Sequence, residues 1–195
     1  MNRYSLSALV FAATISCNAR GATGDLIIFD DADRNGFDHA SALCTSGGGM
    51  FGETTVVHSG TAAVALSRHT DNNGAGWLAP VSYSATSDYD GVTFWVNSGN
   101  SESAHTSLAI LDAGSNPHFM HLEDMYGAPL PAATWIHFQV PFSSPLFAAA
   151  VSTSPDTVKT ICVITHSSTG SFSDFLYLDE VSLTGADIFK DGFGN

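Results

Sequence analysis

The feature that most constrains this chain is a succession of short apolar or alternating runs separated by turn-rich breaks. About ten runs recur every ten to fifteen residues or so, and no long amphipathic helix is visible. This pattern is typical of an antiparallel sandwich rather than of alternating β and α units. We predict an all-β jelly-roll β-sandwich with a loop at 71–76 and strands at 25–31, 55–57, 62–67, 77–81, 91–97, 107–112, 118–123, 135–141, 160–165 and 172–184.

The final strand carries a carboxylate in an apolar row. Strand side chains alternate between two faces. One face is then predicted to hold Phe175, Tyr177, Asp179, Val181 and Leu183, and the other Leu176, Leu178, Glu180 and Ser182. Because Asp179 falls in the row expected to be buried, its ionised carboxylate needs a partner from elsewhere in the chain.

The opening strand, DLIIFDD, offers such a partner because it also ends in carboxylates, Asp30 and Asp31. A site where the two termini meet would cluster hard oxygen ligands, which favour Ca²⁺. The alternative is that these aspartates are simply solvated at the strand ends, as is common in acidic surface proteins.

The first 24 residues have the pattern of a secretory signal, with Arg3 before an apolar run from Leu6 to Ile15 and small residues after it. We expect a secreted or periplasmic protein. Cys17 leaves open a lipoprotein anchored to the outer membrane, although Thr14 stands where that motif usually has an aliphatic residue. We expect no transmembrane segment.

Charge restricts the partners of the remaining chain. Loss of the signal removes Arg3 and Arg20 and no acidic residue, so the net charge changes from −13 to −15. We expect no nucleic-acid partner, because phosphate binding rests on Lys and Arg, and anionic polysaccharides are disfavoured. Neutral sugars, cations and basic partners fit. We expect one domain over residues 25–185, assumed monomeric, followed by a tail over 186–195.

Two cysteines lie beyond the signal, Cys44 and Cys162. In an exported chain a single disulfide is the natural expectation, and two buried thiols are the alternative.

The order of six segments resembles a known family. IIFDDADRNGF, VVHSGTAAVAL, GWLAPV, YDGVTFWVNSG, ATWIHFQVPF and FLYLDEVSL are similar to successive strands of carbohydrate-binding-module jelly rolls of the galactose-binding-like type, which occur in secreted bacterial proteins. The tail, ADIFKDGFGN, resembles the IFxDGFE ending of exported gammaproteobacterial proteins. The resemblance implies a structural Ca²⁺ held by Asp30 or Asp31, the backbone near Ser59 and Gly60, and Asp179.

The resemblance also implies a sugar site on the concave face of one sheet, where aromatic rings stack on pyranose faces beside hydrogen-bonding groups. The candidate ligand-binding residues are Trp77, Phe119, His121, Glu123 and Tyr126, and a neutral polysaccharide is the expected partner. Trp95 and Trp135 align with positions that look structural in the family, and the apolar residues on both sides of each favour packing in the core. The stretch from Ser41 to Glu53 departs from the family because it lacks the tryptophans often found there.

Catalysis is the less favoured interpretation. His118, His121, Glu123 and Asp124 form a dense polar cluster, but in a strand His121 and Glu123 face away from His118 and Asp124. His121 and Glu123 could bind a metal if His137 or His105 supplied a third ligand. No hydrolase, metalloprotease or P-loop signature occurs. The hypotheses are therefore a non-catalytic carbohydrate-binding module, an adhesive or structural surface protein, and a jelly-roll hydrolase or metal enzyme.

Overall fold

The computed structural model describes residues 24–39, 44, 47–67, 73–100, 105–147, 154–165 and 175–185. Apart from Gly24, the predicted signal lies outside this part, as does the predicted tail. The strands are β1 (Leu26–Asp30), β2 (Ala32–Asp33), β3 (Asp38–His39), β4 (Gly47–Gly48), β5 (Met50–Glu53), β6 (Ala63–Ser67), β7 (Asn73–Ser84), β8 (Tyr89–Asn97), β9 (Thr106–Leu111), β10 (Pro117–His121), β11 (Trp135–Pro141), β12 (Thr157–Thr165) and β13 (Phe175–Gly185). Two short helices are α2 (Leu122–Tyr126) and η1 (Pro145–Phe147).

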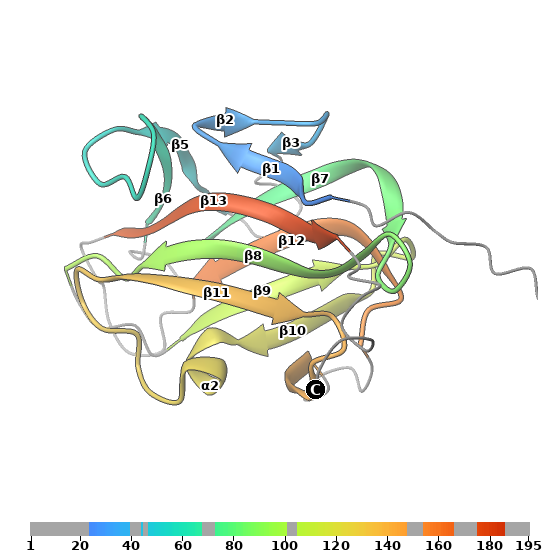
Figure 1. Ribbon diagram of the computed structural model, residues 1–195. Coiled ribbons are helices and arrows are strands. Elements are labelled where there is room, and N and C mark those ends of the chain that lie inside the picture. Colours follow the sequence, from blue (N-terminus) through green and yellow to red (C-terminus); the bar gives the residue numbers. More distant parts are fainter. Residues whose placement is uncertain are drawn as a thin grey trace, which may run out of the picture.

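The strands form two sheets that face each other, which confirms the predicted all-β jelly-roll sandwich (Figure 1). One sheet has seven strands in the order β11, β8, β13, β1, β2, with β6 beside β13 and β5 beside β6. The other has six strands in the order β10, β9, β12, β7, β3, with β4 parallel to β7. No helix in the described part of the chain has the length and apolar character needed to cross a membrane.

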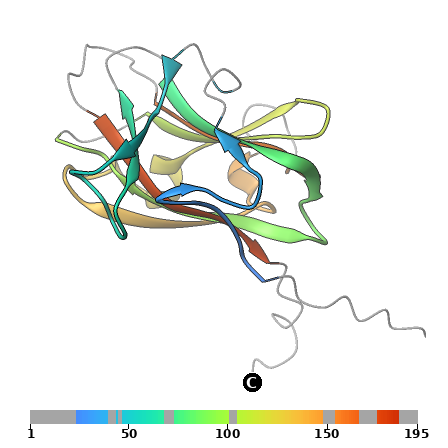
Figure 2. The same cartoon turned by 90° about the horizontal axis from the view of Figure 1, so that it is seen from above.

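Strand β13 lies in the middle of the seven-stranded sheet and has a different neighbour along each half. Its first half pairs with β6 and its second half with β1, while β8 runs along its other side. The start of β1 and the end of β13 lie side by side (Figure 2), as the pairing of Leu26 with Leu183 requires. Asp179 sits where the neighbour changes from β6 to β1.

The predicted alternation along this last strand holds for only part of its length. Glu180 has a φ of 50°, and the register with β8 shifts between Asp179 and Ser182. This bulge changes which side chains face inward, so Leu176 and Leu178 join Val181 and Leu183 in the core between the sheets. Asp179 therefore lies on the opposite face from the one predicted.

Other predicted segments also differ. Residues 55–57 form a turn-rich loop rather than a strand, and β7 begins at Asn73, inside the segment predicted as a loop. Strand β10 ends at His121, where helix α2 begins; the helix is closed by Gly127, whose φ is 84° and whose N–H bonds to the Glu123 carbonyl. The remaining predicted strands are present, with small differences at their ends.

The predicted disulfide is confirmed: Cys44 is bonded to Cys162 on β12, 118 residues later. Cys162 packs with Ala109 and Ile164 in a small cluster separate from the main core. Beneath the bond lies Gly76 of β7, where any Cβ would overlap the Cys44 sulfur. The disulfide thus covers part of the outer face of the six-stranded sheet.

Candidate functional site

A hollow of about 280 Å³ lies on the outer face of the seven-stranded sheet. Thr93 and Ser182 are paired across β8 and β13 and alternate with buried core residues, so both point away from the core. Ile27 of β1 pairs with Ser182 from the other side and is 43% exposed. Short hydroxyl side chains beside taller neighbours produce the depression, whose lining is Ile27, Phe29, Asp30, Thr93, Trp95, His137, Glu180 and Ser182.

A stack of three rings borders this hollow. Trp95 pairs with His137 across β8 and β11, and their ring centroids are 4.7 Å apart at 21°. The His58 ring stacks on Trp95 at 3.8 Å and 18°. Trp95 is the middle ring of this stack, and Trp95 and His137 both line the hollow and form its aromatic wall.

The orientation of His137 is set by Thr93. The Thr93 hydroxyl donates to the Phe138 carbonyl oxygen at 3.0 Å and lies 2.7 Å from His137 Nε2. Because the single hydroxyl proton is used by the carbonyl, His137 Nε2 is the donor to Thr93 Oγ1. This network fixes the orientation of the imidazole in the wall.

Two carboxylates, Asp30 and Glu180, complete the lining. Glu180 is turned out of the strand by its left-handed backbone conformation, accepts the Ser59 hydroxyl, and lies 3.5 Å from His58 Nδ1. Hydroxyls, carboxylates and an aromatic wall in one depression can contact both the apolar and the hydroxyl-bearing surfaces of a sugar.

Beside the hollow, Asp179 and Asp31 hold one loop, residues 58–62. Asp179 is 0% exposed; its Oδ2 accepts the N–H groups of His58 (2.9 Å) and Ser59 (3.2 Å), and its Oδ1 that of Glu180 (2.8 Å). Asp31 Oδ1 accepts the N–H groups of Thr61 (2.5 Å) and Ala62 (2.7 Å). The loop covers Asp179, which explains how a side chain on the outer face becomes buried.

The two carboxylates differ in whether burial or these N–H bonds has the larger effect on the pKa. Burial raises the pKa of Asp179 above its ordinary value, against the opposing effect of the N–H bonds from Ser59, His58 and Glu180. The pKa of Asp31 is lowered, chiefly by the N–H bonds from Thr61 and Ala62. Amide donors thus stabilise both ionised groups.

Of the residues predicted to bind calcium, Asp31, Ser59, Gly60 and Asp179 meet at this loop, whereas Asp30 lines the hollow. Calcium prefers carbonyl and carboxylate oxygens. The loop instead presents N–H groups to both carboxylates, which fits an amide-held loop better than a preformed cation cage. Calcium binding stays a prediction.

The structure separates the residues predicted to bind sugar. Trp77 is 0% exposed, packs against Phe29 and Phe51, and donates from Nε1 to Asp33 Oδ1 at 3.1 Å. It has no open ring face, so its assignment as a stacking residue is wrong. Phe119 is half-buried against the cluster around Cys162, close to the disulfide.

The other three predicted residues lie around the end of β10. His121 Nδ1 is 3.0 Å from Ser107 Oγ, Glu123 Oε1 accepts the Thr106 N–H at 2.8 Å, and Tyr126 is 46% exposed. Burial raises the pKa of Glu123, opposed by N–H bonds that include that of Thr106. These three side chains lie together at the edge of the six-stranded sheet, but Trp77 is in the core and is not part of that surface.

The alternative metal arrangement is only partly consistent with the structure. His118 is buried and His121 exposed, as their predicted opposite faces require. Asp124 and Glu123, however, lie on α2 rather than on a strand. His137 belongs to the outer face of the other sheet, so it cannot complete a site with His121.

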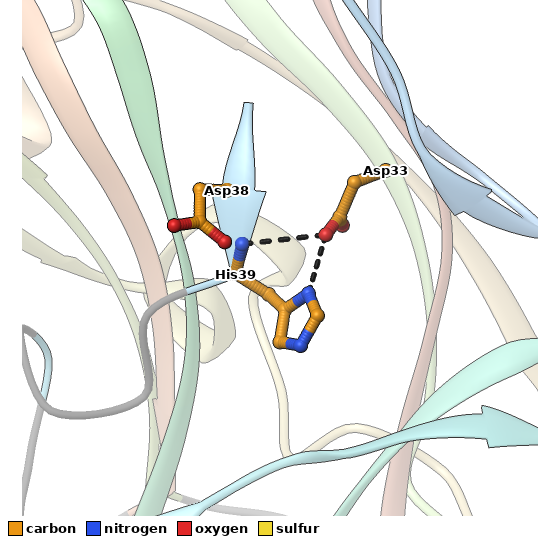
Figure 3. A group of neighbouring side chains, drawn as sticks. All are labelled: Asp33, Asp38 and His39. Carbon is orange, nitrogen blue, oxygen red and sulfur yellow. Dashed lines mark hydrogen bonds and ion pairs between the residues drawn. The ribbon is translucent and has the colours of Figure 1, made fainter. Parts of the chain in front are cut away.

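Among the described residues, Asp33, Asp38 and His39 bring three possible metal-ligating atoms within 4.8 Å of one another (Figure 3). Asp33 is already engaged: Oδ2 accepts the backbone N–H of His39 at 3.3 Å and contacts its ring Nδ1, while Oδ1 accepts Trp77 Nε1. The hydrogen bonds of Asp33 therefore join β2 to β3 and to the buried Trp77.

Sequence reasoning missed the outer-face hollow because it assigned Trp95 to the core. A signal was present in VTFWVN, where Thr93 and Trp95 share one face and Val92, Phe94 and Val96 the other. No comparable signal marks Glu180, whose orientation depends on the bulge.

Comparison with known proteins supports the fold. No protein-family model matches the sequence, and no curated protein is significantly similar to it. The family 11 carbohydrate-binding module from Clostridium thermocellum, solved with a β-1,3-1,4-mixed-linked tetrasaccharide, is 15% identical with a TM-score of 0.50, over 85% of this chain and 98% of that one. An adhesin domain of Lys-gingipain from Porphyromonas gingivalis is 14% identical with a TM-score of 0.50, over 84% and 98%.

An exo-β-agarase matches with 10% identity and a TM-score of 0.54, over 84% of this chain but 25% of that one. At these identities the likeness shows a shared fold alone. The chain thus has the jelly-roll architecture found in carbohydrate-binding modules and adhesin domains.

Proposed function

We propose that this protein is a secreted, non-catalytic module that binds a neutral polysaccharide through the hollow on its seven-stranded sheet. The observation that carries the proposal is the hollow itself: an aromatic wall of Trp95 and His137 stands beside the hydroxyls of Thr93 and Ser182. Planar apolar surface next to polar groups is what a pyranose ring requires.

The similar structures add support in general terms, because one is a carbohydrate-binding module in complex with a β-1,3-1,4-mixed-linked tetrasaccharide. The disulfide supports an oxidising, extracellular location. The non-catalytic role is supported in general terms by the carbohydrate-binding module among the similar structures.

We expect weak affinity. A sugar gains ring contacts and a few hydrogen bonds but loses hydrogen bonds to water of similar quality, so a Kd of roughly micromolar to millimolar is reasonable. The net charge of −15 after loss of the signal favours neutral glucans, xylans or mannans over pectins and alginates.

Retention in affinity electrophoresis tests this proposal. The mature protein should be retarded in gels containing a neutral polysaccharide. Ser182→Phe, which fills the hollow, should abolish retention, and Tyr126→Ala, on the other sheet's edge, should not. Loss of retention in Tyr126→Ala alone would place the site at β10 and α2. No retention on any polysaccharide would favour an adhesive or structural surface role.

A structural calcium ion is a second, separate proposal. Its support is that two carboxylates, Asp31 after β1 and Asp179 on β13, hold the same loop. A calcium ion there would bind these carboxylates and stabilise the native state, as any ligand specific to it does.

A further inference from the structure

A second hollow, of about 360 Å³, adjoins the first along the strands of the seven-stranded sheet. Gln139 lines it and pairs with Thr93, which lines the first hollow. Thr184 also lines it, two residues beyond Ser182 on β13. Two strand residues span about 7 Å, so one short oligosaccharide can reach both hollows.

Both hollows carry carboxylates. Asp30 and Glu180 line the first, and Asp25 and Asp90 line the second. In the second, Asp25 Oδ1 accepts the Gly185 N–H and Asp90 Oδ1 accepts the Thr184 hydroxyl, both at 3.0 Å. These bonds fix the carboxylates in place along the same face.

Few positive groups oppose these charges. The lining of the two hollows contains no Lys or Arg, and the described part of the chain has only Arg34 and Lys159. Arg34 donates to the Asp30 carbonyl oxygen at 3.1 Å, and Lys159 donates to the Ala79 carbonyl on the other sheet. His137 in the wall and His58 beside Glu180 are the titratable groups that could add positive charge.

We infer that the two hollows together select a polysaccharide whose sugars carry a protonated amine, such as a β-linked glucosamine polymer, over its neutral counterparts. This inference rests on the proposed function, because it assumes that the same face binds a sugar, and it adds that sugars with a protonated amine bind there more tightly than neutral ones. An ammonium group set among carboxylates gains attraction that a hydroxyl at the same carbon cannot provide. The aromatic wall supplies the contact with the sugar ring that favours a glycan over a basic peptide.

The test compares three β-1,4-linked hexamers that differ only at carbon 2: glucose, glucosamine and N-acetylglucosamine. Calorimetry at a single pH, at which the amine is protonated and the carboxylates ionised, keeps the state of both histidines constant. An exposed ion pair changes affinity by about two- to five-fold, so two or more pairs should favour the glucosamine hexamer by about tenfold at low salt. Raising the salt should remove most of this preference.

The variant Asp30→Asn with Glu180→Gln keeps side-chain size and removes both charges of the first hollow. It should reduce affinity for the glucosamine hexamer while leaving the glucose hexamer nearly unchanged. Asp124→Asn, an exposed position on α2, is the matched control and should change neither.

The outcomes separate the two proposals. Equal affinity for the glucose and glucosamine hexamers would overturn the inference and leave carbohydrate binding intact. Absence of binding by all three hexamers would overturn the inference, and affinity electrophoresis on neutral polysaccharides then decides separately whether the proposed function stands. Binding of hexalysine as tightly as the glucosamine hexamer would show that charge alone is recognised and would also overturn the inference.

Discussion

Asp179 and Trp95, which lie opposite each other on β13 and β8, hold the same residue from two directions. Asp179 accepts the backbone N–H of His58, and the Trp95 indole stacks on the His58 ring at 3.8 Å. The loop that buries Asp179 is thereby joined to the aromatic wall of the hollow. His58 thus connects the buried carboxylate that holds the loop to the aromatic ring that borders the hollow.

Replacing Asp179 should therefore destabilise the protein. Asp179→Ala removes the acceptor of three backbone N–H groups in a fully buried place, and we expect the free energy of unfolding to fall by about 3 kcal/mol or more. Urea denaturation measures the change. Asp124→Ala, on the exposed side of α2, should change it by less than about 0.5 kcal/mol; an equally small effect of Asp179→Ala would contradict the account.

A pair of glycines tests the contact between the loop and Asp31. Gly60 and Gly127 both have positive φ, 65° and 84°, but a Cβ on Gly60 would overlap the Asp31 carboxylate, whereas nothing lies within 4 Å of one on Gly127. Gly127→Ala should destabilise by about 1 kcal/mol from backbone strain alone. Gly60→Ala should destabilise clearly more by the same denaturation assay, and equal effects would show that Asp31 does not pack against the loop.

Acid should reduce the contribution of Asp31 to the stability of the folded protein. Its folded pKa lies below the ordinary value of 3.8, so the stabilisation is present above that value and is lost as the pH falls through the folded pKa. The Tm difference between wild type and Asp31→Asn should therefore be constant near pH 6 and shrink as the pH falls toward about 2. A difference that stays the same over this range would show that the N–H bonds to Asp31 do not favour its ionised form.

Calcium should raise the Tm if the second proposal is correct. At a concentration of about one hundred times its Kd, a ligand that binds only the native state adds about 2.7 kcal/mol to the free energy of unfolding. Thermal denaturation in chelator and in rising calcium measures this, with magnesium as the comparison. An unchanged Tm would leave the four N–H bonds that the loop donates to Asp31 and Asp179 as its support.

The strands could be predicted because their side-chain alternation is local, as VTFWVN illustrates for β8. The disulfide could be predicted because few cysteines remain beyond the signal. The burial of Asp179 was anticipated, but not its cause, because a bulge at Glu180 and a covering loop are tertiary features without a sequence period. Trp77 was expected on the ligand-binding face and lies in the core, whereas Trp95 was expected in the core and lines the hollow. The sequence could not separate them, because a large ring with apolar neighbours looks the same in the core and on a partly covered face.

The central claim is that the ligand lies in the hollow beside Trp95, and NMR titration with mixed-linked glucan or glucosamine oligosaccharides tests it most directly. The account predicts saturable shifts of the Trp95 indole N–H and of the Thr93 and Ser182 amides, with little change at Tyr126. Shifts confined to His121 and Tyr126, with the Trp95 signals unchanged at saturation, would contradict it.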